Sequence, residues 1–546
     1  MLFRCTARLV IFISTGAAAV LSGGCGTEHF KAEADREVYK IIDNKWHPDF
    51  GQKTNYVISD VQAAGADVQI APSAPESGVI SLAQAVALAT ADNRNYSKQK
   101  EELYQAALGL SSERHNYARQ WFGFIGGKYA RTGENEDVSL YTGEKGPGNT
   151  QDKDLGFDHR QLLAGGLEIS TALAVDWFRF LTGDPRTSLG SVLTASVAVP
   201  LLGASRGKVD LENLTQAERE VLYRIRSFNR YRKEFVVSIV AEYYGVLQKR
   251  DAVTNAENNY KMVAESKERL EWEAKAGRKT LFEVDQAQQR VLTARDNYVS
   301  AVQSYQQQLD AFKLQLALPT DADIELDQNE LGALEKTGVS EPDYTVVEAI
   351  ETALLERLDL ANTADRIDDV VRKVILAQEG LGPQLDLTGD LNVDSTPETD
   401  FSRLRFHQGR YGAALEADLP LDRKLQRNAY RGKLIELQQQ QRQYEEQLDI
   451  IKLQVRDAYR QLKESAQLYQ IQQNSVKLAQ DRVESTTMLL DAGRTWARDL
   501  LEAQDDLLAA QNSLTAALIK HATAKLTFFR DVGILQVRPD GMWLVK

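Results

Sequence analysis

The sequence predicts a mainly α-helical fold that also contains amphipathic β-strands, with one structural unit written twice along the chain. Proline divides the chain symmetrically: two proline-free stretches of equal length run from Pro200 to Pro319 and from Pro420 to Pro539. Ahead of each stretch, the spacing of apolar residues changes from a helical period to a period of two. A repeated order of strands followed by a long proline-free segment indicates an internal duplication of the chain.

Each proline-free stretch contains an Ala-Gly-Arg turn, and the two turns lie at a constant offset of 216 residues, as from Gly277 to Gly493. After each turn, large residues and alanines alternate at spacings of three and four. The two matched series are Val284, Ala287, Val291, Ala294, Tyr298, Ala301 and Tyr305, and Leu500, Ala503, Leu507, Ala510, Leu514, Ala517 and His521. This heptad spacing predicts packed helices with a left-handed supercoil. We expect two antiparallel hairpins with arms of roughly 70 residues, or about 100 Å. A soluble coiled coil has the same periodicity and stays an alternative.

Strict alternation of apolar and polar residues predicts strands between shorter helices and the hairpins. The clearest strands lie at 385–394, 411–419 and 167–177, with others near 121–129 and 193–199. Their polar faces carry Asp386, Asp390, Asp394, Glu416 and Asp418. We expect Ser81 and Thr345 to cap the short helices that open the two repeats. Alternation alone also fits a half-buried sheet in a soluble protein.

Composition argues against several classes of function. The chain of 546 residues has a net charge of -13, so it lacks the basic excess that binds nucleic acid. Its 6 histidines are scattered, which leaves no sequence-local zinc spacing. It has no Gly-rich phosphate loop and no nucleophile elbow. We therefore expect no catalytic residues, no cofactor, no metal and no enzyme activity.

The N-terminus predicts a signal peptide over residues 1–24. Arg4 and Arg8 precede a mostly apolar run from Leu9 to Leu21, which is too short for a membrane span. Ser22-Gly23-Gly24-Cys25 resembles a bacterial lipobox, although Ser22 stands where leucine is usual. The resemblance implies that Cys25 carries lipid such as palmitate, and that Gly26 directs the lipoprotein to the outer membrane. An ordinary signal peptide with a chance cysteine is the alternative.

From Ile80 to Val532, the order of elements resembles the TolC-like outer-membrane efflux proteins. The junctions Val199-Pro200-Leu201-Leu202 and Leu419-Pro420-Leu421 carry this resemblance, as do the Ala-Gly turns followed by Glu283-Val284 and Asp499-Leu500. It implies a homotrimer whose strands close one β-barrel in the outer membrane and whose helices close one tunnel across the periplasm. Trp121, Trp177, Phe178 and Phe180 would form an aromatic belt. The long segment from Arg131 to Pro200 departs from the family pattern and predicts an extra strand hairpin.

The same resemblance implies a function and its partners. The trimer would be the exit duct of a tripartite efflux or type I secretion system, joined to an inner-membrane pump by a periplasmic adaptor. Docking would use the two turns, at Ala276, Gly277, Arg278, Lys279 and Thr280 and at Ala492, Gly493, Arg494 and Thr495. Asp499 and Glu502 match the acidic aperture ring of the family, where six carboxylates would raise some pKa values and favour cations. Arg494 or Arg498 would tether neighbouring chains there.

The predicted organisation follows the repeats. A lipid-tethered leader covers 25–79, the first repeat 80–319, a linker 320–343, the second repeat 344–530 and a tail 531–546. The alternative function is a lipid-anchored periplasmic adaptor or a structural coiled-coil protein. Adaptors usually have one hairpin, however, whereas this sequence predicts two hairpins and amphipathic strands.

Overall fold

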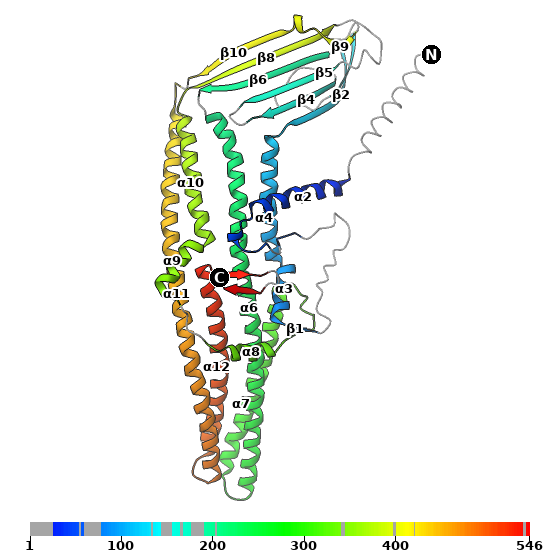
Figure 1. Ribbon diagram of the computed structural model, residues 1–546. Coiled ribbons are helices and arrows are strands. Elements are labelled where there is room, and N and C mark those ends of the chain that lie inside the picture. The colour runs from blue at the N-terminus through cyan, green and yellow to red at the C-terminus, as the bar shows by residue number, and fades with distance from the viewer. Residues whose placement is uncertain are drawn as a thin grey trace, which may run out of the picture. The chain divides into compact units, whose positions relative to one another are not determined.

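A computed structural model describes residues 26–53, 56–58, 78–132, 135–142, 155–163, 167–175, 191–202, 205–339, 344–396, 400–419, 421–538 and 542–545. Within these ranges the chain is mostly helical and carries one large sheet (Figure 1). No helix in the described part of the chain has both the length and the apolar character needed to cross a membrane. Cys25, Trp177, Phe178, Phe180 and Pro420 lie outside the described residues.

The two predicted helical hairpins are confirmed. The first consists of α6 (Ser205–Lys275) and α7 (Leu281–Gln315), and the second of α11 (Lys424–Asp491) and α12 (Ala497–Val532). The outgoing arms have 71 and 68 residues, as expected, but the return arms have only 35 and 36. The expectation of about 70 residues in every arm was wrong for the return arms, because each turn lies past the middle of its proline-free stretch: Pro319 follows Gly277 by 42 residues and Pro539 follows Gly493 by 46. Left-handed residues lie just beyond the ends of the return arms, at Ala317 (φ 58°) and Gly533 (φ 92°).

A pair of shorter helices opens each repeat. The first pair is α3 (Leu82–Asp92) with α4 (Arg94–Asn116), and the second is α9 (Val346–Glu356) with α10 (Leu358–Glu379). Ser81 and Thr345 cap α3 and α9 as predicted, each in a reciprocal capping box with Gln84 or Glu348. The capping box satisfies amide donors that a helix start leaves unpaired.

One antiparallel sheet combines strands from both repeats. The first repeat supplies β2 (Gln120–Thr132), β3 (Asn135–Thr142), β4 (Leu155–Leu162), β5 (Glu168–Val175) and β6 (Ser191–Leu202). The second supplies β8 (Gln384–Thr396), β9 (Asp400–Leu404) and β10 (Arg410–Asp418). Their order is β10-β8-β6-β5-β4-β2-β3, with β9 beside β8, so β6 and β8 join the repeats. The antiparallel pair β4 and β5 confirms the extra hairpin predicted before Pro200, and β3 adds a further strand that was not expected.

Smaller elements complete the fold. The leader contains α2 (Thr27–Lys45) and the short turn η1 (Pro48–Phe50). The parallel pair β1 (Val79–Ile80) and β7 (Glu325–Leu326) leads to α8 (Asn329–Thr337) in the linker. The turn η2 (Phe406–Gln408) precedes β10, and the tail ends in the antiparallel pair β11 (Leu535–Val537) and β12 (Trp543–Val545).

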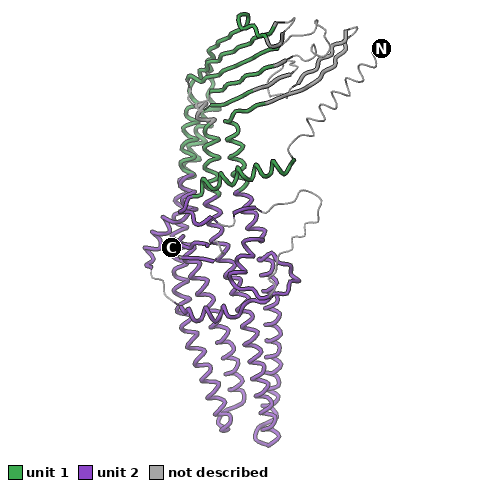
Figure 2. The backbone as a smooth tube through the Cα atoms, turned by 45° about the vertical axis from the view of Figure 1, so that its right-hand side comes forward, with its two compact units in different colours: residues 1–46, 104–224, 366–440 green, residues 47–103, 225–365, 441–546 purple. Residues whose placement is uncertain are grey.

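The chain divides into two compact units, and each takes residues from both repeats (Figure 2). Unit 1 comprises residues 1–46, 104–224 and 366–440 and includes the sheet. Inside it, α2 is fixed to its neighbours by Lys45, which bonds Glu218 at 2.5 Å, and by Tyr104, which donates to Asp35 at 2.5 Å. Unit 2 comprises residues 47–103, 225–365 and 441–546 and includes both hairpin turns. The predicted domain boundaries follow the sequence repeat rather than these compact units, and they stay a prediction.

Candidate functional sites on the sheet and at the helix turns

The predicted acidic residues share one face of the sheet. In the antiparallel register, Asp386 lies opposite Glu416, and Asp418 lies opposite Gln384. Directly paired residues point to the same side of a sheet, and residues two apart along a strand do so as well. Asp390 and Asp394 therefore lie on the same face as Asp386. This face continues onto β5 and β6, where the Ser170 and Ser196 hydroxyl oxygens are 2.7 Å apart.

The opposite face of the same sheet is apolar and exposed in a single chain. Leu387 lies opposite both Leu415 on β10 and Val199 on β6. Exposed fractions are 39% for Leu387 and 62% for Leu415, and Val197 on the neighbouring strand is 38% exposed. A continuous apolar face of this kind normally marks a contact with lipid or with another protein. Trp121, the one proposed belt residue in the described ranges, is 70% exposed at the start of β2.

The two helix turns have the same backbone geometry. Gly277 and Gly493 have φ values of 72° and 69°, the left-handed conformation that glycine tolerates best. Following Gly277, the Arg278 amide donates to the Glu273 carbonyl at 2.9 Å. Following Gly493, the Arg494 amide donates to the Leu489 carbonyl at 2.8 Å. These are Schellman motifs, so the predicted role of glycine in ending each outgoing arm is confirmed.

The acid three residues into each return arm caps its helix. Glu283 accepts from the Thr280 amide at 3.0 Å and from the Thr280 hydroxyl at 3.2 Å. Although burial acts to raise the pKa of Glu283, these bonds and Lys279 outweigh it and lower the pKa. Asp499, at the matching position, accepts from the Thr495 hydroxyl at 2.6 Å and from the Trp496 amide at 3.3 Å. The Thr495 bond, followed by the Trp496 bond, lowers the pKa of Asp499.

The second predicted aperture acid, Glu502, lies among other charged groups on the second hairpin. Arg482 on α11 is 3.9 Å from Glu502 and bonds Asp506 more closely. Asp505 pairs with Arg290 on α7 at 2.8 Å, yet burial outweighs this pairing and raises the pKa of Asp505. One chain therefore gathers several carboxylates just beyond the second turn, and their arrangement in a ring of several chains stays a prediction.

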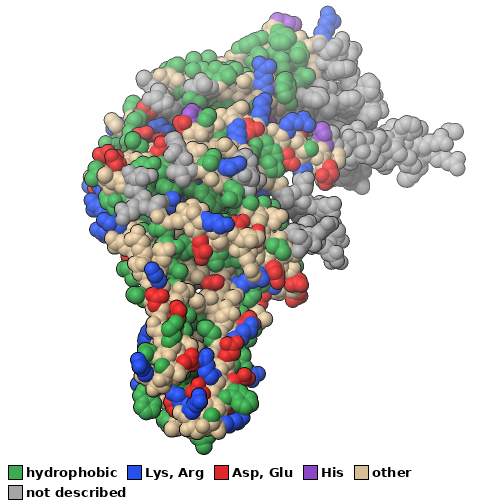
Figure 3. All heavy atoms as spheres, turned by 60° about the horizontal axis from the view of Figure 1, so that its bottom comes forward, with side chains coloured by type: hydrophobic (Ala, Val, Ile, Leu, Met, Phe, Trp, Pro, Cys, Tyr) green, Lys and Arg blue, Asp and Glu red, His purple; other side chains and the backbone are tan. Residues whose placement is uncertain are grey.

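Sequence reasoning missed a group of exposed apolar side chains beside the turns. Trp272, Leu281, Phe282 and Trp496 are 70% to 77% exposed. Viewed from the end that carries the turns, hydrophobic side chains are interspersed with both kinds of charge (Figure 3). The available signal was that these large residues fall outside the buried heptad positions, where a helix surface in water is usually polar.

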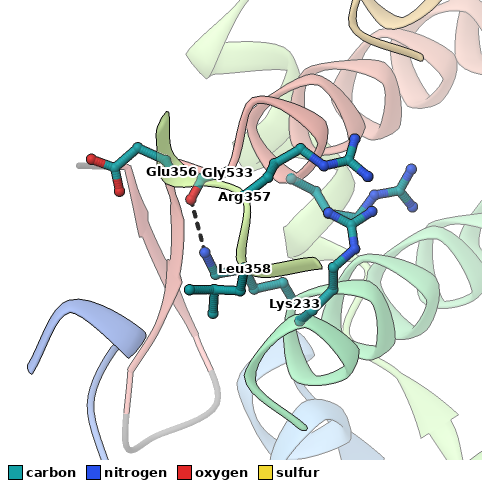
Figure 4. Close-up of a pocket in the computed structure, with 7 residues that line it drawn as sticks. Lys233, Glu356, Arg357, Leu358 and Gly533 are labelled. Carbon is teal, nitrogen blue, oxygen red and sulfur yellow. Dashed lines mark hydrogen bonds between the residues drawn. The ribbon is translucent and has the colours of Figure 1, made fainter. Parts of the chain in front are cut away.

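The described residues form small cavities lined by charged side chains. One cavity of about 10 Å³ is lined by Arg230, Lys233, Glu356, Arg357, Leu358, Arg530 and Gly533 (Figure 4). The Lys233 ammonium donates to the Gly533 carbonyl at 2.8 Å, and Arg357 bonds Asp359 at 2.6 Å. Burial acts to raise the pKa of Asp359, but Arg357 and Arg230 outweigh it and lower the pKa. The cavity has room for about one water. The residues described here also contain no cluster suited to a metal ion.

Comparisons with known proteins agree with this arrangement. Residues 349–530 match the family model described as outer membrane efflux protein. Among solved structures, the chain is similar to the outer-membrane channel OprN, at 14% identity and a TM-score of 0.58 over 88% of this chain and 99% of that one. It is also similar to VceC of Vibrio cholerae, at 14% identity and a TM-score of 0.57, over 83% of this chain and 96% of that chain. The CmeC channel of Campylobacter jejuni is similar at 16% identity and a TM-score of 0.57, over 88% of this chain and 93% of that chain. No curated protein sequence matches.

Proposed function

The chain carries an outer membrane efflux protein domain in its second repeat, and from this premise we propose that three copies form a channel that is the exit duct of an efflux or secretion system. The observation that carries the proposal is the two-faced sheet, apolar on one side and acidic on the other. In a barrel that crosses a membrane, the apolar side faces lipid and the polar side lines the water-filled path. A channel has no need of a catalytic residue, and we assign none.

The sheet supports a barrel that several chains share. In the described order β10 and β3 form the two edges of the sheet, and β10 pairs only with β8. An unpaired strand edge exposes backbone donors and acceptors, and these cannot stay unpaired in the hydrocarbon region. Closure against the edges of sister chains satisfies them.

The hairpins support the same assembly. Leu292 and Val299 on α7 are 58% and 56% exposed in a single chain. On α11, Leu453, Ile471 and Leu478 are 56%, 59% and 68% exposed. We assign these surfaces to contacts between neighbouring copies, with α7 of one copy against α11 of the next. A closed ring of three then builds the tunnel wall.

We assign the ends of the channel by position. Lipid on Cys25 anchors the leader at the outer membrane, and the hairpin turns reach into the periplasm. Ala276, Gly277 and Arg278 in the first turn and Ala492, Gly493 and Arg494 in the second receive the adaptor that leads to the pump. The pump supplies the energy, so the channel itself is passive. The acidic lining favours cations.

Asp499 and Glu502 are the proposed periplasmic gate. They lie three positions apart on α12 and therefore share a helix face. Asp499 already caps α12, so in this proposal one carboxylate both fixes the start of the helix and carries charge to the narrowing. Arg494 and Arg498 stay the proposed tethers to the adjacent copy.

Two measurements on the full-length purified chain test the duct. In detergent, its mass should correspond to three copies, and in a planar bilayer it should give discrete conductance steps. A monomer that forms no pore would refute the proposal. A trimer without pores would instead support the alternative of a periplasmic adaptor or structural coiled-coil protein.

A further inference from the structure

His521 lies on α12 at the end of the heptad series and packs against α11. It is 3% exposed, and its neighbour Ser465 on α11 is fully buried. At the matching position of the first repeat, α7 carries Tyr305, which does not titrate near neutral pH. Histidine is therefore a special feature of the second hairpin rather than of the repeated unit.

The hydrogen bonds define which ring nitrogen of His521 carries a proton. The Ser465 hydroxyl donates to the Leu462 carbonyl at 2.8 Å, which uses its only hydrogen. The Ser465 oxygen, 3.2 Å from Nδ1 of His521, can then only accept a hydrogen from the ring. On this pattern we assign the proton of the neutral ring to Nδ1, which leaves Nε2 as an acceptor. Nε2 is buried and has no hydrogen-bond partner among the described residues.

A proton on Nε2 would have an unfavourable environment. The Leu462 backbone carbonyl acts to raise the pKa of His521, but burial, followed by the charge of Lys525 one turn along α12, outweighs it and lowers the pKa. The other charged groups near this level are Lys520 and Glu464, which pair across α11 and α12 at 2.9 Å. On the α6 side, the Asp251 carboxylate accepts a hydrogen bond from the Thr515 hydroxyl at 2.6 Å, so this carboxylate is engaged by Thr515. The described residues offer the imidazolium no carboxylate partner.

We propose that His521 is a pH-sensitive latch in the seam between α11 and α12, closed by the neutral ring and loosened when Nε2 takes a proton. The sign follows from the direction of the pKa change. In the folded chain the pKa of His521 lies below the ordinary histidine value of 6.5, so the ring stays neutral to a lower pH than in the unfolded chain. The contact between α11 and α12 is therefore fully stable above pH 6.5. Stability is lost as the pH falls below it, because the open seam binds the proton more readily. The inference concerns this seam alone and does not depend on the channel assignment.

Hydrogen exchange of the full-length protein tests the latch. Amides around Ser465 and His521 should lose protection between about pH 7.5 and about pH 5.5, after correction for intrinsic exchange, while amides of α7 around Tyr305 should not. In His521→Gln the pH-dependent loss should disappear. The exposed His115 on α4 supplies the matched control, since His115→Gln should keep the wild-type response.

Two outcomes would overturn the proposal. One is a seam whose protection in the wild type is the same at both pH values, or whose loss persists in His521→Gln. The other is an NMR titration of the wild-type protein in which His521 has a pKa at or above its ordinary value. The second measurement needs no variant, so it decides the matter even if His521→Gln fails to assemble.

Discussion

The two return arms, α7 and α12, show how one repeated sequence pattern takes two different environments. They have 35 and 36 residues and the same heptad spacing of large residues and alanines. In α12, Leu500, Ala503, Leu507, Ala510, Ala517 and His521 are all buried. In α7, Ala287 and Ala294 of the matching heptad series are buried, whereas Val284, Val291 and Tyr298 are only partly buried.

The contacts explain the difference. Asn255 and Asp251 of α6 bond Asn512 and Thr515 of α12 at 3.0 and 2.6 Å, so α12 packs against the first hairpin as well as against α11. Val284 and Val291 of α7 pack against the buried cluster that contains Leu500, but they stay partly accessible, so the chain itself covers the heptad series of α7 incompletely. A heptad stripe therefore identifies a packing surface without telling whether the partner is in the same chain.

Truncating the buried stripe should have the largest effect. Leu500→Ala is expected to lower the free energy of unfolding by about 2–5 kcal/mol, because it leaves a cavity at a side chain that is 3% exposed. The matched Val284→Ala in α7 should cost less than about 1 kcal/mol in dissociated chains. Denaturant unfolding in detergent measures both. Equal losses would contradict the difference in burial between the two arms. A Val284 effect that grows when copies of the chain associate would show that a neighbouring copy covers the rest of the α7 series.

The turns should respond alike, because their geometry is the same in both hairpins. Gly277→Ala and Gly493→Ala should each cost about 1 kcal/mol, since an L-residue is strained at positive φ. Thermal unfolding measures the loss. Substrate export by cells carrying each variant then reports docking, with Gly332→Ala in α8 as the control, because a Cβ at Gly332 meets nothing within 4 Å. Export that is normal with both turn variants would argue against docking at the turns.

Asp499 and Glu283 occupy the same capping position on α12 and α7, so substituting each one distinguishes a role in capping the helix from a role in the gate. Asp499→Asn with Glu502→Gln should change conductance and weaken cation block in planar bilayers. The control is Glu283→Gln, which alters the equivalent cap on α7 and should leave block unchanged. Cation block that is unchanged in the double variant would reject the gate assignment. Because the folded pKa of Asp499 is lowered, its cap is stabilising above its ordinary pKa of 3.8 and is lost as the pH falls below that value.

Removing the anchor should have the smallest effect on either hairpin. Cys25→Ser should abolish labelling of the chain by radioactive palmitate, while helical content and thermal unfolding stay as in the wild type. Labelling that persists would show that Cys25 is not the lipidated residue. Membrane association alone does not distinguish the outcomes, because a barrel also holds the chain in the membrane.

Local chemistry explains which features the sequence could predict. The Ala-Gly-Arg turns and the hydroxyl caps at Ser81 and Thr345 act within a few residues, and the structure confirms the turns and caps. The prolines mark the limits of the long helical stretches, and the structure confirms the hairpins within them. The return-arm length was missed although the sequence limits it, because Pro319 follows Gly277 by only 42 residues. Asp499 was recognised as an acid beside a turn, but its bond to Thr495 needs coordinates. The unequal burial of α7 and α12 depends on long-range packing, which periodicity does not contain.

The Schellman motifs at Gly277 and Gly493 have an evolutionary consequence. Main-chain hydrogen bonds and one glycine define each bend, so the flanking side chains contribute little to its shape. Substitutions at Arg278, Lys279 or Arg494 can therefore accumulate while the bend is preserved. Under the proposed docking at these turns, recognition of an adaptor could therefore change by single substitutions while the backbone of the bend stays the same.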